Sequence, residues 1–269
     1  MSTRELAGGK LLLDHPAEAV ARLTLSNPER RNALDHDVLD ALTEVLPELD
    51  RGIEVRCVVL TGAGGTFSAG YDIAGFEDGS FERDAEALVA HPFHAAMEAV
   101  STHPYPVLAA IDGPCLGGAL ELAVRCDLRL ASERAKLGMP PAKLGLIYGH
   151  TGLERFIEVV GVARTKELFL TGRILSAARA ERIGLVHEVV PDGEIESAAV
   201  ALASEIAANA PLATRANKHI IETLARFPRL TTEQERELVE LRRSCFSSED
   251  LREGIRAFEE KRKPRWQGR

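Results

Sequence analysis

Apolar and polar positions alternate along the first half of the chain at two different spacings. Residues 19–26 alternate around Leu23 and Leu25, which predicts a half-buried strand. Residues 38–49 carry apolar side chains at helical spacing, which predicts an amphipathic helix. Short continuous apolar runs, typical of strands covered on both faces, occupy 56–62, 106–113 and 127–132. Strands and helices therefore alternate, and this order favours an α/β core with crossover connections.

The second half of the chain is mainly helical in pattern. Apolar residues recur at helical spacing from Gly152 onward, again over 195–206, and in a long amphipathic stretch over 231–263. The segment 184–190 is the last strand candidate. We expect two parts: an α/β core over residues 1–195 and a helical C-terminal region over 196–269. This region is too amphipathic for a linker and should pack on the core or on neighbouring subunits.

Composition narrows the classes of protein. The net charge of −8 argues against a general nucleic-acid binder, which needs cations to neutralise phosphates. No apolar run approaches the roughly 18 residues of a membrane span, and the N-terminal run of three leucines is too short for a signal peptide. The four cysteines show no Cys-x-x-Cys spacing. The sequence therefore predicts a cytoplasmic protein with reduced thiols and neither a membrane nor a nucleic-acid partner.

Two glycine-rich loops follow predicted strands. The first, "TGAGGTFSAGYDI", spans 61–73, and the second, "DGPCLGGALELAVRCD", spans 112–127. A glycine loop that leads into a helix leaves backbone N–H groups free, and such groups hold phosphate or a developing oxyanion. Neither loop has the Gly-Lys-Ser/Thr ending of a phosphate-binding P-loop. Each loop alone could be a tight turn, but the presence of two such loops favours a site that binds a phosphate or an oxyanion.

Six segments resemble the crotonase (enoyl-CoA hydratase/isomerase) superfamily, in the family's order. They are "NPERRNALD" (27–35), "FSAGYDI" (67–73), "GPCLGGALELAVRCDL" (113–128), "AKLGL" (142–146), "LTGRILSAARAERIGLVHEVV" (170–190) and "EDLREGIRAFEEKRKP" (249–264). The resemblance implies a crotonase-like ββα spiral core, followed by a helical C-terminal trimerisation region. It also implies a homotrimer or homohexamer that acts on an acyl-CoA thioester. Coenzyme A is then part of the substrate, and no metal or redox cofactor is implied.

The resemblance also implies roles for individual residues. The backbone N–H groups of Tyr71 and Gly118 would hold the thioester oxygen while an enolate forms. Residues implied in coenzyme A binding are Arg30 and Arg31 at the phosphates, Ala69, Asp72 and Ile73 at the adenine, and Phe258 and Lys261 at the nucleotide end, often from a neighbouring subunit.

Glu121 is the candidate acid–base group. It lies three residues after Gly118, so both residues share one helix face. A structural alternative is a glutamate paired with Arg125 at i+4. The family's hydratases carry a second glutamate at the position of Pro141, and proline cannot transfer a proton. In this respect, and in having Tyr148, the chain resembles in part the methylmalonyl-CoA decarboxylase branch, although that branch has a histidine where Tyr71 stands.

Two reactions and two other functions remain open on this basis. Hydration or isomerisation of an enoyl-CoA, as a lyase of the enoyl-CoA hydratase type, is favoured by Glu121. Decarboxylation of a malonyl-type CoA is favoured by Pro141 and Tyr148, with His150 as a further proton donor. The other functions are a non-catalytic acyl-CoA binder and an RNA-associated relative. We interpret the histidines at 91–94 and His103 as structural or surface residues, and Cys115 as no nucleophile.

Overall fold

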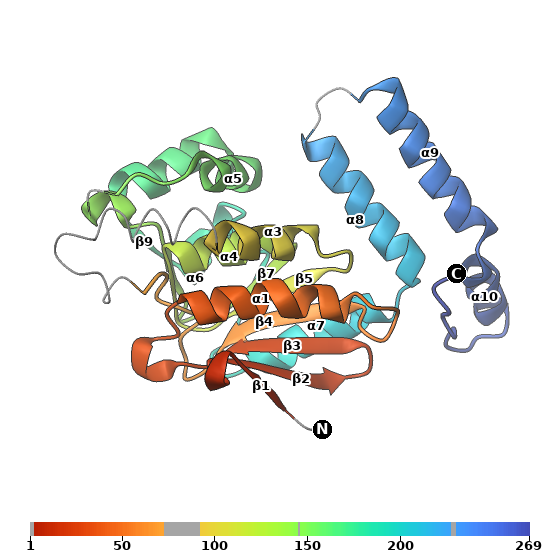
Figure 1. Cartoon of the computed structure of the whole chain (residues 1–269), viewed down its shortest axis with the longest axis horizontal. Helices are drawn as coiled ribbons and strands as arrows, with labels where there is room; N and C mark the ends of the chain where they lie inside the picture. The colour runs from red at the N-terminus through yellow and green to blue at the C-terminus, as the bar shows by residue number, and fades with distance from the viewer. Residues whose placement is uncertain (1–2, 73–91, 145, 227–229) are drawn as a thin grey trace.

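The computed structural model describes residues 3–72, 92–144, 146–226 and 230–269 (Figure 1). Within these residues a seven-stranded sheet has the order β1-β2-β3-β4-β5-β7-β10. Its strands are β1 (Arg4–Leu6), β2 (Leu11–Ala17), β3 (Val20–Leu25), β4 (Cys57–Gly62), β5 (Val107–Ile111), β7 (Leu128–Ser132) and β10 (Glu188–Val190). β1, β2 and β3 are antiparallel, whereas β3, β4, β5, β7 and β10 run parallel.

A second, three-stranded sheet lies beside the first and has the order β6-β8-β9. Its strands are β6 (Pro114–Leu116), β8 (Lys136–Gly138) and β9 (Ile174–Ser176). The described helices are α1 (His36–Leu49), α3 (His94–Thr102), α4 (Gly118–Arg125), α5 (His150–Thr171), α6 (Ala177–Arg182), α7 (Ile195–Ala207), α8 (Pro211–Arg226), α9 (Thr232–Ser247) and α10 (Glu249–Glu259). None of them is both long and apolar enough to cross a bilayer.

Successive residues of β4 point to opposite faces of the large sheet, and each face has its own helical cover. Cys57 and Val59 join a cluster with the alanines of α7. Val58 and Leu60 face the other way, into the larger cluster under α1, α3 and α4. Strands buried on both faces must be apolar throughout, which explains the continuous runs in the sequence.

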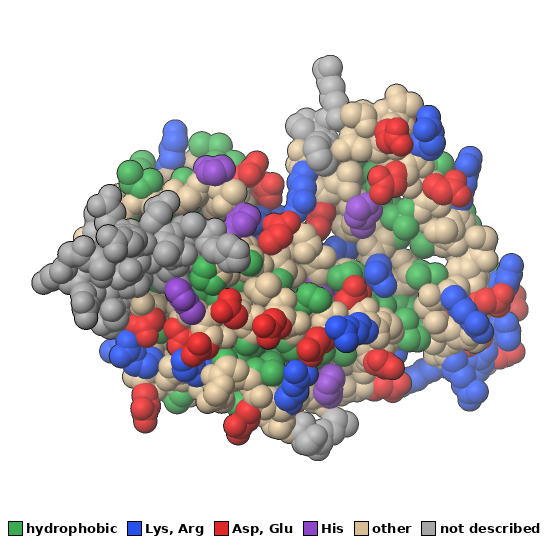
Figure 2. Space-filling model, in the orientation of Figure 1, with side chains coloured by type: hydrophobic (Ala, Val, Ile, Leu, Met, Phe, Trp, Pro, Cys, Tyr) green, Lys and Arg blue, Asp and Glu red, His purple; other side chains and the backbone are tan. Residues whose placement is uncertain are grey.

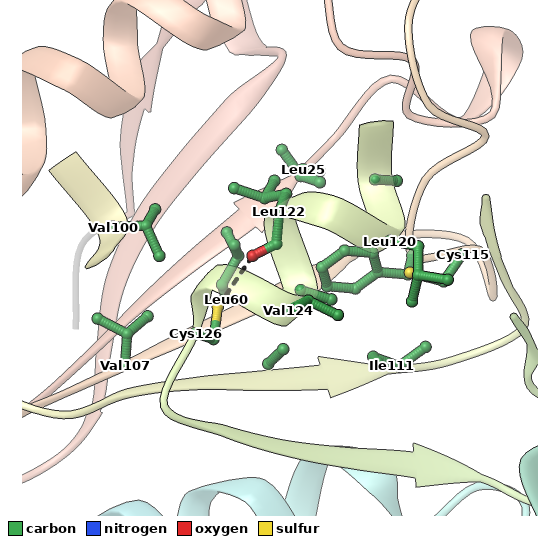
Figure 3. Packing of buried hydrophobic residues seen from close by; sticks show 14 of the residues in the cluster. Leu25, Leu60, Val100, Val107, Ile111, Cys115, Leu120, Leu122, Val124 and Cys126 are labelled. Carbon is green, nitrogen blue, oxygen red and sulfur yellow. Dashed lines mark hydrogen bonds between the residues drawn. The ribbon is translucent and has the colours of Figure 1, made fainter. Parts of the chain in front are cut away.

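Helix α4 is held against the sheet by its apolar residues (Figure 3). Leu120, Leu122 and Val124 are fully buried in the larger cluster. The thiol of Cys126, just after the helix, donates to the carbonyl of Leu122 at 3.4 Å. This packing fixes α4, and with it the polar residue Glu121, which shares the helix with these leucines.

Helices α9 and α10 lie at the opposite end of the molecule from α5 (Figure 1). Helices α9 and α10 are separated at Ser248, whose side chain caps α10 by accepting from the N–H of Leu251. The last residues fold back: the Trp266 indole donates to the carbonyl of Ala208, and Asp250 accepts from the N–H groups of Gln267 and Gly268. The predicted stretch 231–263 is therefore two helices and a turn.

The predicted mixed α/β class with C-terminal helices is confirmed. Two elements were not anticipated. The N-terminal hairpin β1–β2 contains the three-leucine run, and the small sheet contains strands of only three residues, too short for a periodic signal. The division at residue 195 stays a prediction, and α7, which begins there, packs on the large sheet.

Asn32 fixes the segment that connects β3 to α1. Its side chain is buried, donates to the carbonyls of Ala63 and Thr66, and accepts from the N–H of Asn27. Arg31 and Asn32 both have left-handed backbones, with φ of 52° and 54°. The buried amide thus ties this segment to the first glycine loop.

Replacing Asn32 with alanine should destabilise the protein by about 1–3 kcal/mol, because buried backbone groups lose their partners. Urea denaturation measures this loss. Arg31→Ala is the matched control, since it has the same backbone conformation and an exposed side chain. Equal losses in the two variants would contradict the role of the buried amide.

Candidate active site

The two glycine loops meet at Gly70. A Cβ atom at Gly70 would lie 2.6 Å from the carbonyl oxygen of Leu116 and 3.3 Å from the nitrogen of Gly118. Gly70 also has φ of 98°, a conformation that other residues rarely adopt. The sequence therefore needs glycine here for both space and conformation, and the contact brings Tyr71 beside the start of α4.

Two backbone amides are available at this junction. Among the described residues, neither the N–H of Tyr71 nor that of Gly118 donates a hydrogen bond, whereas the adjacent N–H groups of Asp72 and Gly117 donate to the carbonyls of Leu34 and Gly138. Gly118 is the first residue of α4, where amides have no helical partner. The Tyr71 ring covers Gly118, because a Cβ there would lie 2.9 Å from the ring. Two free donors beside a buried helix terminus can hold a negatively charged oxygen.

Glu121 lies on the first turn of α4 and is 3% exposed. Its nearest charged partner is Arg125, whose Nη2 lies 3.3 Å from Oε1. Burial raises the pKa of the Glu121 carboxyl above its usual range. Tyr148, Arg125 and His94 favour the charged form and oppose that shift. A carboxyl with a raised pKa is a stronger base when ionised and can both accept and return a proton.

Two tyrosine hydroxyls are buried near Glu121. The hydroxyls of Tyr71 and Tyr148 have no well-formed hydrogen bond in the described part of the chain. Burial raises the pKa of both phenols, and the charge of Glu121 adds to each shift. The Tyr71 ring packs on Phe93 at 4.5 Å, and the Tyr148 ring meets Phe169 edge-on at 5.4 Å. The site thus contains one carboxylate and two neutral phenols, and the Tyr148 phenol interacts with that carboxylate.

Gly152 lets Glu121 and Tyr148 come together. A Cβ at this position would lie 2.8 Å from Oε2 of Glu121 and 2.8 Å from the Tyr148 ring. Gly152 is the third residue of α5, one turn after Tyr148. Pro141 begins the short 3-10 helix Pro141–Leu144 that precedes this segment and offers no acidic group.

Four residues predicted to bind coenzyme A lie together, two in the first loop and two in the segment before α1. The N–H of Ala69 donates to the carbonyl of Arg31 at 3.0 Å, and the Arg30 guanidinium pairs with Asp72. The Arg30 side chain is half exposed. Ile73 lies outside the described residues. The structure therefore brings Arg30, Arg31, Ala69 and Asp72 to one edge of the site.

Phe258 and Lys261 lie far from this loop within one subunit. Phe258 is on α10 and 86% exposed, and Lys261 follows that helix. Figure 1 places α10 at the opposite end of the molecule from the first loop. A contribution of these two residues to the same site would need a neighbouring subunit, as the resemblance implied.

The other histidine and cysteine residues considered in the sequence do not join Glu121 and the two tyrosines. His150 is the exposed first residue of α5, so its place differs from that of Tyr148. His103 is buried, and burial lowers its pKa to about 4. Cys115 is fully buried, which raises the pKa of its thiol. No group of three or more metal-ligating side chains occurs among the residues that the structure describes.

Phe93 and Gly152 could not be recognised as site residues from any sequence pattern. Both contribute through contacts between elements: Phe93 supports the Tyr71 ring, and Gly152 leaves room for Glu121. The pairing of Glu121 with Arg125 was foreseen from their i, i+4 spacing.

Comparison with known proteins gives one consistent result. The family model described as enoyl-CoA hydratase/isomerase matches residues 15–269. A short-chain-enoyl-CoA hydratase of Clostridium acetobutylicum is 35% identical over 254 residues, covering 91% of this chain and 92% of that protein. The crystal structure of an enoyl-CoA hydratase from Bacillus anthracis has a TM-score of 0.89 and 34% identity, covering 97% and 100% of the two chains. An enoyl-CoA hydratase/carnithine racemase from Magnetospirillum magneticum has a TM-score of 0.89 and 33% identity, covering 97% and 96%.

The buried carboxylate predicts a pH-dependent stability difference. Because the pKa of Glu121 is higher in the folded than in the unfolded chain, ionisation costs stability as pH rises between those two values. Glu121→Gln avoids this cost. It should therefore gain stability over wild type as pH rises from the unfolded pKa to the higher folded pKa, by roughly 1.4 kcal/mol for each unit of pKa shift.

Chemical denaturation over this pH range measures the difference. Glu98→Gln removes an exposed carboxylate on α3 and is the control. A stability difference between Glu121→Gln and wild type that stays constant with pH would contradict the buried, pKa-raised carboxyl.

Proposed function

Since this chain belongs to the enoyl-CoA hydratase/isomerase family, we propose that it is a lyase of the enoyl-CoA hydratase type that works through a thioester enolate. The single observation that carries this proposal is the pair of free amides at Tyr71 and Gly118 beside the buried carboxyl of Glu121. An enolate needs its charge held on oxygen and needs a proton moved at carbon. The two amides suit the first task, and Glu121 suits the second.

The amides act on the thioester oxygen. As water adds to Cβ of the enoyl group, negative charge moves to this oxygen, and donors already in place stabilise that charge most in the transition state. Removing one such donor typically costs about 10²–10³ in rate.

Glu121 transfers the proton in this proposal. As a carboxylate it takes a proton from water while the hydroxyl oxygen bonds to Cβ. The same carboxyl then returns a proton to Cα of the enolate, which completes the addition of one water molecule. Tyr148 orients the water or the acid form of Glu121 through its hydroxyl, which is buried and interacts with that carboxyl. This scheme needs one carboxylate, and it suits a chain with Pro141 at the position of the second.

Coenzyme A binds, in this proposal, along the edge formed by Arg30, Arg31, Ala69 and Asp72, and Ile73 stays a predicted contact. Phe258 and Lys261 would approach from a neighbouring subunit. Self-association as a homotrimer or homohexamer is supported by large apolar side chains that are exposed on α8, α9 and α10. They are Ile221, Leu224, Phe246, Leu251, Ile255 and Phe258. The cytoplasmic location stays a prediction.

Decarboxylation of a malonyl-type CoA is a second candidate, favoured by the buried phenols of Tyr71 and Tyr148. Loss of CO₂ forms the enolate without a base, and a phenol can then donate a proton to carbon. Crotonyl-CoA and methylmalonyl-CoA distinguish the two reactions. Tight acyl-CoA binding with no turnover of either substrate would instead support a non-catalytic binder.

Substitution at Gly118 tests the amide pair. Gly118→Pro removes the N–H and adds atoms against the Tyr71 ring, whereas Gly118→Ala adds a Cβ there but keeps the N–H. The proline variant should lose about 10²–10³ more in kcat than the alanine variant. Steady-state kinetics on folded proteins measures this ratio, and equal rates in the two variants would exclude the Gly118 amide.

Substitution at Glu121 tests the proton transfer. Glu121→Gln should lower crotonyl-CoA hydration by about 10²–10⁴, because general acid–base catalysis is lost. Methylmalonyl-CoA decarboxylation, if present, should be far less affected. Hydration that survives in Glu121→Gln at the wild-type rate would remove Glu121 from the mechanism.

A further inference from the structure

The two carboxylate oxygens of Glu121 have different surroundings. Oε1 accepts from Nη2 of Arg125 at 3.3 Å. Oε2 is the oxygen that a Cβ on Gly152 would approach to 2.8 Å, next to the Tyr148 ring. One oxygen therefore faces Arg125 on the same helix, and the other faces the segment that begins α5.

Arg125 is itself anchored to that segment. The same Nη2 donates to the carbonyl of Thr151 at 3.0 Å. The Arg125 and Glu121 side chains are 11% and 4% exposed, so water cannot readily replace either contact. Thr151 stands between Tyr148 and Gly152 in the sequence. The guanidinium thus connects the Glu121 carboxylate on α4 to the backbone segment that carries Tyr148 and Gly152. These two residues lie next to the other carboxylate oxygen.

We propose that Arg125 is a positioning residue that binds Oε1 of Glu121 and turns Oε2 toward Tyr148 and the reacting atoms. The inference rests on the proposed role of Glu121 as the base. With Oε1 held, the carboxylate presents one basic oxygen in one orientation. Because the anchor is the carbonyl of Thr151, the spacing of Glu121 and Tyr148 is set by the same side chain.

Titratable groups face Glu121 from several elements. The groups that face Glu121 are Arg125 from α4, His94 from α3, Tyr71 from the first loop and Tyr148 before α5. Among the described residues, Arg125 is the one cation within ion-pair distance of the carboxylate. Its positive charge lowers the pKa of Glu121 against the effect of burial.

The outer side of Arg125 lines a groove of about 810 Å³ between α5 and α8, seen as an indentation in Figure 2. Acidic and basic residues share the lining of this groove. Besides Arg125, the charged residues in this lining are Glu98, Asp127, Glu154, Arg155, Glu158, Lys218, Glu222 and Arg226. Since both signs are present, their fields partly cancel, whereas Arg125 contacts Glu121 directly.

Arg155 provides a matched control. Its Nε donates to the carbonyl of Val124 at 3.2 Å, and its Nη1 pairs with Glu158. It therefore links α5 to α4 and lines the same groove, but its guanidinium forms no hydrogen bond with Glu121. A purely structural role in joining the two helices should show in Arg155→Met as much as in Arg125→Met.

The experiment compares pH profiles of kcat/KM for crotonyl-CoA in wild type, Arg125→Met, Arg125→Lys and Arg155→Met. Losing the cation should move the acidic limb of Arg125→Met to higher pH by about one unit or more, because Glu121 then ionises less readily. Lysine keeps the charge but not the planar fork, so Arg125→Lys should lie between wild type and Arg125→Met. Arg155→Met should keep the wild-type limb.

A second readout does not depend on turnover. The infrared carboxyl band that disappears in Glu121→Gln should titrate at higher pH in Arg125→Met, in step with the kinetic limb. An unmoved limb and band in folded Arg125→Met, or an equal shift in Arg155→Met, would overturn the inference. If wild type has no hydratase activity but the infrared band moves as expected, the proposed function fails and the positioning by Arg125 holds. If Arg125→Met does not fold, Arg125→Lys carries the same comparison.

Discussion

The contact between Gly70 and the backbone of Leu116 controls the distance between the two glycine loops. A side chain at Gly70 would collide with the carbonyl of Leu116, and the loops would have to separate. Separation would move the amide of Tyr71 away from that of Gly118, and it would take the Tyr71 ring off the start of α4. Behind this contact, α4 is fixed by its leucines in the core, and the first loop is tied to the segment before α1 by Asn32. Packing remote from the site therefore sets the separation of its two donors.

Glu121 shows how the site combines burial with charge. A carboxylate inside an apolar helix is costly unless it has partners. Here one oxygen has a cation, and the other lies beside a phenol and a glycine. A neutral phenol adds a dipole beside Glu121 without adding charge. A second carboxylate at the same place would add a negative charge that repels the first. A site with Pro141 in place of a second glutamate therefore carries a different charge. It does not differ only in having one proton-transfer group fewer.

Much of this arrangement could be predicted from the sequence, because it depends on local patterns. The apolar runs predicted β4, β5 and β7, the spacing of Gly118 and Glu121 placed both on one helical turn, and the i, i+4 spacing suggested Arg125. The contacts of Gly152 with Glu121 and of Phe93 with Tyr71 could not be predicted. They depend on how α5 and α3 pack against α4, and packing between elements distant in sequence leaves no periodic trace in either one.

Tyr71 combines two kinds of chemistry in one residue. Its amide belongs to the backbone, so every substitution except proline preserves it, whereas its phenol is lost with almost any change. The proposed mechanism divides the site in the same way: the groups assigned to the thioester oxygen are amides, and those assigned to proton transfer are side chains. Random mutation thus rarely touches the first set and readily exchanges the second. Proteins that share this loop pair can therefore change their reaction by exchanging side chains, while the two backbone amides that would bind the enolate oxygen are retained.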